Sequence, residues 1–327
     1  PKTLGYQNVV PVKSRSCLDV TPPVLEFLAK KPKEPFFAMV GFTETHRPFP
    51  QYDGPVDAVQ PLPYLPDVPG VRRDVAALNI VVRRADEKIG EILDTIEETG
   101  LNGNTLVTFT TDHGIAFPGA KATLLDPGIE IALLMRGPYG VEGGKRVDAL
   151  LSNIDFMPTI LDFCDLPVPR NVQGESMLPL IRGQTEALHD VIFVEQTYHA
   201  AYDPMRGVRT NRYKYIRSFE KRSFWLPPNI DAGFSKEVAR QLGYFDLARP
   251  PEMLFDLKDD PLEKNNLAAD PNFADLLRLM RTTLSNWMRE TNDAMLKGYI
   301  PPHPGSRITP PESYRPDENI VQVQQET

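Results

Sequence analysis

TLVTFTTDHGIAFPGAKATLLDPGIEIALLMRG, residues 105–137, holds two apolar runs with a polar loop between them. The first run, residues 106–111, is rich in β-branched and aromatic side chains and predicts a buried strand, which ends at an Asp-His-Gly sequence beginning at Asp112. The second run, residues 129–135, predicts another buried strand. Ligands of open α/β sheets bind outside the carboxyl ends of the strands, so the loop between the runs is the first candidate site.

Strand and helix patterns alternate on both sides of this loop. Residues 35–42 (PFFAMVGF) predict a further buried strand, ending shortly before His46. Apolar positions recur every three or four residues across 71–99, which predicts one long amphipathic helix. Short helices are predicted around residues 24–28 and over 155–163. This alternation is typical of a doubly wound α/β layer fold.

The pattern changes at His189, where apolar and polar residues begin to alternate. Alternation predicts an antiparallel sheet with one face in solvent, and a helix over residues 274–291 is expected to cover the other face. We therefore predict an α/β core over residues 1–188, a subdomain over 189–298 and a proline-rich tail over 299–327 that wraps the surface or is partly disordered. The predicted strands of the subdomain are residues 191–194, 207–210, 213–217 and 253–256.

Composition excludes some classes of function. The 327 residues carry 36 Lys and Arg against 44 Asp and Glu, a net charge of −8, which argues against nucleic acid as the main partner. Two cysteines, Cys17 and Cys164, are too few for a disulfide framework. No apolar run is long enough to span a membrane, and the first residues have no signal-peptide pattern.

Reactive side chains gather at two predicted strand ends. Asp112 and His113 offer a carboxylate and an imidazole to a divalent cation, although an Asp in a turn also caps backbone N–H groups. Lys121 and the pair His46-Arg47 could bind an anion, or could be a solvated lysine and a strand cap. Their convergence in a chain with only five histidines favours hydrolysis of a sulfate or phosphate ester, in which developing negative charge must be neutralised.

Five segments in order resemble the sulfatases of the alkaline phosphatase superfamily. The first is the loop itself, with Asp112, Lys121 and the Asp-Pro-Gly at 126–128. The others are residues 152–161 (SNIDFMPTIL), 174–180 (GESMLPL), 206–216 (RGVRTNRYKYI) and 254–267 (LFDLKDDPLEKNNL). Within that family, residues 117–122 and the helix that follows residue 265 are most similar to the heparan N-sulfatases (sulfamidases).

The resemblance implies a fold and an activity. The fold would be an alkaline phosphatase-like sandwich, a central mixed sheet flanked by helices, with a smaller C-terminal α+β domain that holds an antiparallel sheet. The activity would be metal-dependent hydrolysis of sulfate esters or sulfamates on sulfated sugars. A homodimer is one expected assembly. The family also implies a periplasmic, secreted or lysosomal compartment, which no feature of the sequence specifies.

The resemblance also assigns residues. Asp112 and His113 would complete the shell of a single Ca²⁺, with His113 where many members have Asn. His46 and Lys121 would be the catalytic residues that contact the sulfate group and the leaving atom. Arg47, His199 and Arg206 would bind the substrate.

One departure from the family limits what the chain can do alone. Sulfatases make a formylglycine nucleophile from a C/S-x-P-x-R motif, and the 327 residues contain none; Cys17 is followed by Leu-Asp-Val. The paired aspartates that form the other half of the metal shell are also missing. The chain is therefore expected to be the later portion of a sulfatase, inactive without an N-terminal segment that supplies the nucleophile.

Two alternatives remain. A non-catalytic protein could keep a sulfated-glycan pocket without chemistry. A phosphodiesterase-type relative of the same superfamily could use the Asp-His-Gly sequence in a two-zinc site, which would need further histidines near the strand ends. An upstream reading frame with the nucleophile motif would favour the sulfatase over the binding protein, and metal analysis would identify the zinc enzyme.

Overall fold

The computed structural model describes residues 5–32 and 35–324, which form two compact units. Unit 1 comprises Pro1–Leu62, Pro66–Thr108 and Met135–Glu142, and unit 2 comprises Pro63–Leu65, Phe109–Leu134 and Gly143–Thr327. Each unit is assembled from separate segments, whereas the division predicted at residues 188/189 follows chain order. The predicted domain boundaries stay a prediction.

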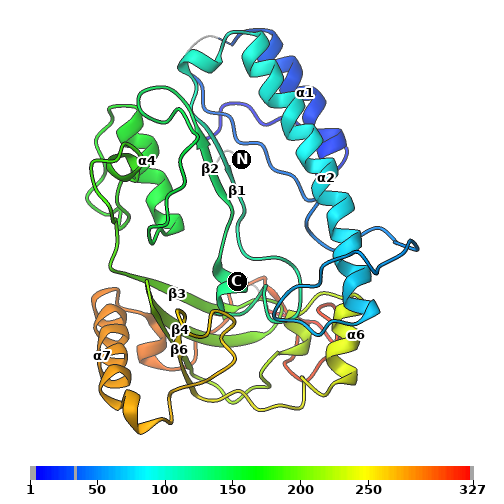
Figure 1. Cartoon of the computed structure of the whole chain (residues 1–327), viewed down its shortest axis with the longest axis vertical. Helices are drawn as coiled ribbons and strands as arrows, with labels where there is room; N and C mark the ends of the chain where they lie inside the picture. The colour runs from blue at the N-terminus through cyan, green and yellow to red at the C-terminus, as the bar shows by residue number, and fades with distance from the viewer. Residues whose placement is uncertain (1–4, 33–34, 325–327) are drawn as a thin grey trace. The chain divides into compact units, whose positions relative to one another are not determined.

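Two helices that lie side by side form much of unit 1: α1 (Cys17–Ala29) and α2 (Pro69–Glu98) (Figure 1). The long amphipathic helix predicted from residue 71 is confirmed as α2. It begins at a proline, which suits the first helical position because that residue's N–H would have no partner in the helix. The apolar residues Leu28, Ile96 and Leu101 form the core between the helices and the start of the first strand.

The buried strand predicted for residues 35–42 is wrong. Residues 36–43 form no regular secondary structure, and Phe37 and Met39 are 65% and 75% exposed. No strand in the described part of the chain pairs with this segment. An extended chain needs a neighbour to satisfy its backbone N–H and C=O groups in a sheet, so apolar composition alone does not make a strand.

The runs that flank the loop form β1 (Val107–Thr110) and β2 (Leu133–Arg136), which pair in a two-stranded sheet. Both strands were predicted to be buried, but Phe109 is 37% and Leu134 is 64% exposed. The second strand starts later than predicted because Asp126–Ile129 forms the helical turn α3, with proline in its first turn. The family implies a larger central sheet, and within the described residues β1 and β2 are the strands that correspond to it.

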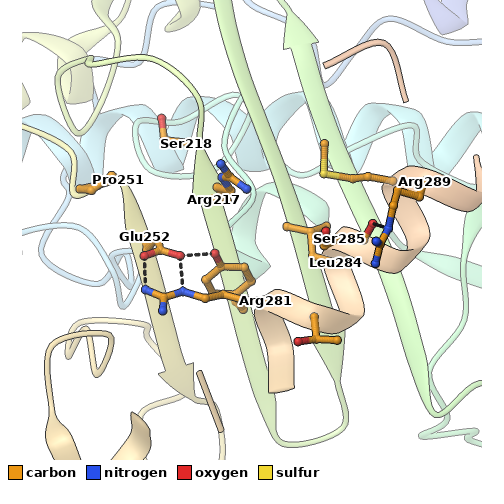
Figure 2. Close-up of a pocket in the computed structure, with 11 residues that line it drawn as sticks. Arg217, Ser218, Pro251, Glu252, Arg281, Leu284, Ser285 and Arg289 are labelled. Atoms are coloured by element: carbon orange, nitrogen blue, oxygen red, sulfur yellow. Dashed lines mark hydrogen bonds and ion pairs between the residues drawn. The ribbon is translucent and has the colours of Figure 1, made fainter. Parts of the chain in front are cut away.

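Unit 2 is built on an antiparallel sheet, as predicted, and its strands follow the order β3-β4-β5-β6. The central residues Val208, Tyr215 and Leu254 are neighbours in the register and pack against helix α7. On α7, Arg281 also pairs with Glu252 on β6 (Figure 2). The bounds are Val191–Tyr198 for β3, Tyr202–Thr210 for β4, Tyr213–Ser218 for β5, Glu252–Asp256 for β6 and Ala274–Glu290 for α7.

The prediction that one face of this sheet lies in solvent is wrong. Met205, Ile216 and Phe255 point to the face opposite α7, where Leu124 of the loop and the half-buried Ile129 cover them. The alternating pattern of the strands cannot identify this cover, because it comes from a segment that ends 76 positions before Met205. The candidate loop is therefore part of the core of unit 2.

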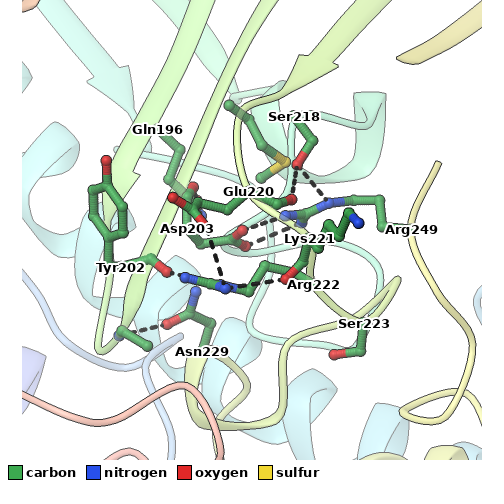
Figure 3. A network of polar contacts seen from close by, with 12 residues as sticks. Gln196, Tyr202, Asp203, Ser218, Glu220, Lys221, Arg222, Ser223, Asn229 and Arg249 are labelled. Atoms are coloured by element: carbon green, nitrogen blue, oxygen red, sulfur yellow. Dashed lines mark hydrogen bonds and ion pairs between the residues drawn. The ribbon is translucent and has the colours of Figure 1, made fainter. Parts of the chain in front are cut away.

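Two further contacts hold unit 2 together. The buried pair Asp203 and Arg249 joins β4 to the segment before β6, with 3.1 Å between Arg249 Nη1 and Asp203 Oδ2 (Figure 3). Lys236 donates to three backbone carbonyls, including that of Tyr314, at 2.6–2.9 Å, and so attaches the proline-rich tail to α6.

The remaining elements of the described chain are short. They are η2 (Asn102–Asn104), η3 (Asn153–Asp155), α4 (Phe156–Phe163), α5 (Leu178–Ile181), η4 (Pro227–Asn229), α6 (Phe234–Gln241), η5 (Pro271–Phe273), η6 (Ala294–Lys297), β7 (Arg307–Ile308) and β8 (Val321–Gln322). None of the helices over the described residues combines the length and apolar character needed to cross a membrane.

Candidate functional site

Two glycines close the candidate loop. The N–H of Gly114 donates to the carbonyl of Gly128 at 2.9 Å, which brings the two ends of the loop together. A Cβ on Gly114 would lie 1.8 Å from the carbonyl oxygen of Pro127, and a Cβ on Gly128 would lie 2.4 Å from that of Ala120. Only glycine permits these approaches, so the glycines of the Asp-His-Gly and Asp-Pro-Gly sequences are explained by backbone packing.

Asp112 and His113 stand at the start of this loop, directly after β1. The Asp112 side chain is 87% exposed, and its Oδ2 lies 3.6 Å from Nε2 of His113. His113 Nδ1 lies 2.7 Å from the carbonyl oxygen of Gly114; since a carbonyl can only accept, Nδ1 carries the hydrogen. In the neutral imidazole, Nε2 would then hold the lone pair that can bind a metal ion, next to a carboxylate.

These two donors do not make a complete calcium site. Calcium takes six to eight oxygen ligands. In the described part of the chain, no group of three His, Cys, Asp or Glu side chains is placed to hold a metal ion. Asp112 and His113 can supply two ligands of a metal shell, and the calcium role stays a prediction.

We expect the chain alone to bind Ca²⁺ weakly. With one exposed carboxylate and one imidazole, the dissociation constant should be about 1 mM or higher, at or beyond the weak end of protein calcium sites. Isothermal titration calorimetry of the apo chain measures this directly. Saturable binding at micromolar Ca²⁺ that Asp112→Ala removes would contradict the expectation and reveal ligands that the described residues do not show.

Lys121, predicted to be catalytic, is buried in an ion pair. Its side chain is 6% exposed, and Nζ lies 2.9 Å from Oδ2 of Asp231. Beside it, Gly119 adopts φ +78° and lies against the ring of Trp225, so that a Cβ there would be 2.7 Å from the ring. Within the described residues, no hydrogen bond or ion pair joins the side chain of Lys121 to Asp112 or His113. Asp231 is 110 positions away, and no sequence pattern pointed to it.

Asp126 fixes the end of the loop on the C-terminal sheet. Its Oδ2 lies 3.1 Å from Nη2 of Arg209, and its Oδ1 pairs with Lys214. Lys214 also lies 2.7 Å from Oε1 of Glu263; both side chains are wholly buried. That approach is not aligned as a hydrogen bond, so the attraction is ionic. Glu263 in turn accepts the backbone N–H of Asp126 at 2.5 Å.

Burial and two neighbouring cations determine the pKa values of the carboxyl groups in this cluster. Burial alone would raise the pKa of Asp126, but Lys214 and Arg209 outweigh it and hold that pKa below its ordinary value. Burial raises the pKa of Glu263 in spite of Lys214. Asp126 thus serves to join the loop to β4 and β5.

His46 and Arg47 lie in unit 1. His46 is exposed and lines a hollow of about 560 Å³, together with Arg15, Arg84 and Glu44. Its Nδ1 lies 2.6 Å from the carbonyl oxygen of Arg47, so Nδ1 is the nitrogen that donates there and Nε2 is the one left for other partners. Lys121 and Asp112 belong to the other unit, so the predicted convergence of all these residues on one cavity stays a prediction.

Arg47, predicted to bind substrate, is 8% exposed. Its guanidinium lies 2.9 Å from Asp74 on α2 and stacks over the ring of Phe49. Both ionised groups are buried, which is typical of a pair that holds structure together. These contacts give no support to the predicted substrate role.

Arg206 and His199 have contrasting environments. Arg206 is 2% exposed, and all five of its N–H donors are used, by Asp293, Thr197 and two backbone carbonyls. Substrate binding by Arg206 therefore has no support in these contacts. His199 is exposed in the turn between β3 and β4, where its N–H donates to the carbonyl of Ala201. Its substrate role stays a prediction.

Two family models match the parts of the chain that contain the candidate loop and strands β3 to β5. Residues 3–166 match the model of the family described as Sulfatase, and residues 118–228 match the C-terminal model of N-sulphoglucosamine sulphohydrolase. The chain belongs to the sulfatase family. The resemblance inferred from the five sequence segments is thereby confirmed.

Curated relatives include further sulfatases. The chain is 31% identical over 323 residues to human N-sulphoglucosamine sulphohydrolase, a match that covers 83% of the chain and 64% of the relative. It is 26% identical over 342 residues to an ulvan-active sulfatase of Formosa agariphila, covering 88% of the chain and 56% of the relative. The sulfatase chain thus spans roughly three fifths of the length of these relatives.

Solved structures confirm the fold class. A 2-O GAG sulfatase superposes with a TM-score of 0.66 at 21% identity, covering 91% of this sulfatase chain and 69% of that one. A protein solved in complex with its substrate D-glucosamine-2-N,6-O-disulfate superposes with a TM-score of 0.54 at 23% identity, covering 68% and 41%. At these identities the likeness is one of fold.

Proposed function

We propose that this sulfatase chain takes part in the hydrolysis of sulfate esters or sulfamates on sulfated sugars. The observation that carries the proposal is the match of residues 118–228 to the N-sulphoglucosamine sulphohydrolase model, since this segment contains Lys121 as well as Asp126 and its partners Arg209 and Lys214 on the sheet. The human relative at 31% identity has the same name. The neighbour that binds glucosamine disulfate supports a sulfated sugar as the substrate class.

Side chains of the chain can perform parts of this chemistry. Exposed His46, whose Nδ1 faces the carbonyl of Arg47 and whose Nε2 makes no hydrogen bond to any described residue, can deliver a proton from Nε2 to a leaving oxygen or nitrogen. Arg15 and Arg84, which line the same hollow, can attract an anion. If its ammonium group releases Asp231 and binds the sulfuryl oxygens instead, Lys121 can stabilise their negative charge. Such stabilisation is strong at a buried site, where the dielectric constant is low.

The proposal assigns other parts to residues outside this sequence. No C/S-x-P-x-R motif occurs in the 327 residues, and the described residues hold no group of three metal ligands. Asp112 and His113 would contribute two ligands to a calcium shell completed elsewhere. The chain alone is accordingly proposed to be inactive.

The missing motif also favours a second candidate, a sulfated-glycan binding protein without catalysis. Such a protein needs the arginine-lined hollow but no nucleophile. The phosphodiesterase-type alternative gains nothing from the structure, because the described residues show no cluster for even one zinc ion.

The decisive experiment is an assay of protein reconstituted with the segment that carries the nucleophile. Glucosamine N-sulfate and glucosamine 6-O-sulfate are supplied separately, and released sulfate is measured by ion chromatography with and without EDTA. Release from either substrate that EDTA stops supports the proposal, and the preferred substrate identifies N–S or O–S cleavage. Binding of both sugars with no sulfate released would establish the glycan-binding alternative instead.

A further inference from the structure

A second hollow lies within unit 2, between the β5–β6 end of the sheet and helix α7 (Figure 2). Its volume is about 670 Å³. Arg217, Arg281 and Arg289 line it, together with one carboxylate, Glu252. We call this hollow the arginine groove. None of the residues predicted from the sequence to act in catalysis or binding lies in it.

The charges of the arginine groove do not balance. Glu252 is fully engaged: Arg281 contacts both of its oxygens, with 2.7 Å from Nε to Oε1, and the Tyr215 hydroxyl donates to the same Oε1. These contacts outweigh partial burial and hold the pKa of Glu252 below its ordinary value, so it stays ionised beside Arg281. The groove keeps a formal excess of two positive charges in a chain whose net charge is −8.

The excess charge resides on Arg217 and Arg289. Both side chains are exposed, and within the described part of the chain neither forms an ion pair within 4.0 Å; Arg217 lies opposite Glu252 in the sheet register and helps to lower its pKa, but it is Arg281 that binds that carboxylate. Arg217 stacks on the ring of Phe219, with 4.7 Å to its centre. Arg289 donates only to neutral oxygens of its own helix, those of Ser285 and Asn286. Each guanidinium therefore keeps N–H donors for a bidentate oxyanion.

The remaining lining narrows the class of ligand. Ser285 and Thr282 present hydroxyls and Pro251 presents apolar surface, whereas Leu284 and Met288 line the groove with only 2% of each residue exposed. A sugar ring has hydroxyls on its edge and C–H groups on its faces, so it matches this mixture. A nucleic acid would need a larger basic surface than an acidic protein offers. A single small anion would engage one arginine and none of the apolar surface.

We propose that the arginine groove binds a sulfated stretch of a glycan chain, with Arg217 and Arg289 each contacting a sulfate or carboxylate group. The choice of a glycan rests on the proposed function, while binding in the groove does not require turnover. The groove would hold a polymeric substrate by a segment distinct from the group that reacts.

The test uses the full chain and a size-defined, sulfated heparin hexasaccharide, with binding measured by isothermal titration calorimetry. Arg217→Ala/Arg289→Ala should bind at least about tenfold more weakly, since two charge-assisted contacts are lost. It should also show a smaller dependence of affinity on salt, because fewer counterions are displaced. Arg278→Ala is the matched control: Arg278 is an exposed arginine of the same helix, pairs with Asp275 at 2.7 Å and does not line the groove.

Equal affinity of the double variant and the native chain, with both folded by circular dichroism, would overturn the proposal. Inorganic sulfate that binds as tightly as the hexasaccharide would overturn the assignment to a glycan. The desulfated, N-acetylated hexasaccharide should not bind. Turnover of glucosamine sulfates by the reconstituted native enzyme is a separate readout. If this turnover is normal but the double variant binds the hexasaccharide as tightly as the native chain does, only the proposal for the groove fails. If the double variant loses binding but the reconstituted native enzyme has no turnover, only the hydrolase proposal fails.

Discussion

Replacing Lys214 by methionine is expected to lower the free energy of unfolding by about 3–5 kcal/mol, the usual cost of removing one partner of a buried ion pair. Lys214 and Glu263 are wholly buried and face each other at 2.7 Å. Asp126 would keep Arg209 as a cation, at 3.1 Å, so Glu263 is the carboxylate left without compensation. Urea denaturation followed by circular dichroism measures the loss.

This loss should depend on pH with a defined sign. Burial already raises the pKa of Glu263 above its ordinary value of 4.5, and without Lys214 the pKa must rise further. A group whose pKa is raised on folding favours the folded state at low pH and disfavours it as the pH rises above the unfolded value. The variant should therefore be closest to the native protein near pH 4 and fall behind towards pH 7.

Two further variants show whether the ion pair is the cause. Lys258→Met changes an exposed lysine just after β6 and should alter stability by less than about 0.5 kcal/mol. Lys214→Met/Glu263→Met removes both charges and should recover much of the lost stability, because no buried charge remains unpaired. A double variant no more stable than Lys214→Met would mean that packing, rather than charge, explains the loss.

Asp112→Ala is expected to reduce metal-dependent sulfate release by the reconstituted enzyme at least a hundredfold, since removing one group that stabilises transition-state charge typically costs a factor of about 10²–10³. The change should hardly affect folding, because the side chain is 87% exposed and accepts only the adjacent N–H of His113. Initial rates at varied Ca²⁺, with thermal unfolding of the same samples, separate activity from stability.

Asp148→Ala is the matched control for this experiment. Asp148 is also an exposed carboxylate of unit 2, 73% exposed, and it pairs only with the exposed Arg146. Its removal should leave sulfate release unchanged. Full activity of Asp112→Ala at all Ca²⁺ concentrations would reject the metal role of this carboxylate.

The sequence predicted correctly those helices and strands that depend on the pattern of neighbouring residues. Helix α2 follows from apolar residues at helical spacing, and the sheet of unit 2 follows from alternation in four short runs. The failure at residues 35–42 has a clear reason: composition describes one strand, but a sheet also needs a partner, and none of the described strands pairs there. Burial of β1 and β2 was overestimated for the same reason, because burial depends on what covers a strand.

The candidate site also has features that the sequence predicted and features that only the tertiary structure shows. Family motifs located the loop, and the structure shows that its glycines close it through the contact of Gly114 with Gly128. Sequence spacing could not show that Lys121 pairs with Asp231, or that Arg47 pairs with Asp74, since these partners lie 110 and 27 positions apart. Buried ion pairs of this kind are set by tertiary packing. The arginine groove was likewise invisible, because its arginines come from β5 and α7.

The position of Leu124 and Ile129 in the core of unit 2 bears on how the protein is made. A ribosome releases these residues about 130 positions before Leu254 and the rest of β6 exist, which at typical elongation speeds is a delay on the order of ten seconds. During that interval the apolar side chains of the nascent loop lack some or all of the sheet that covers them in the folded protein. For the same reason, a fragment that begins after residue 143 would expose one side of its sheet and should be expressed only together with the earlier segment.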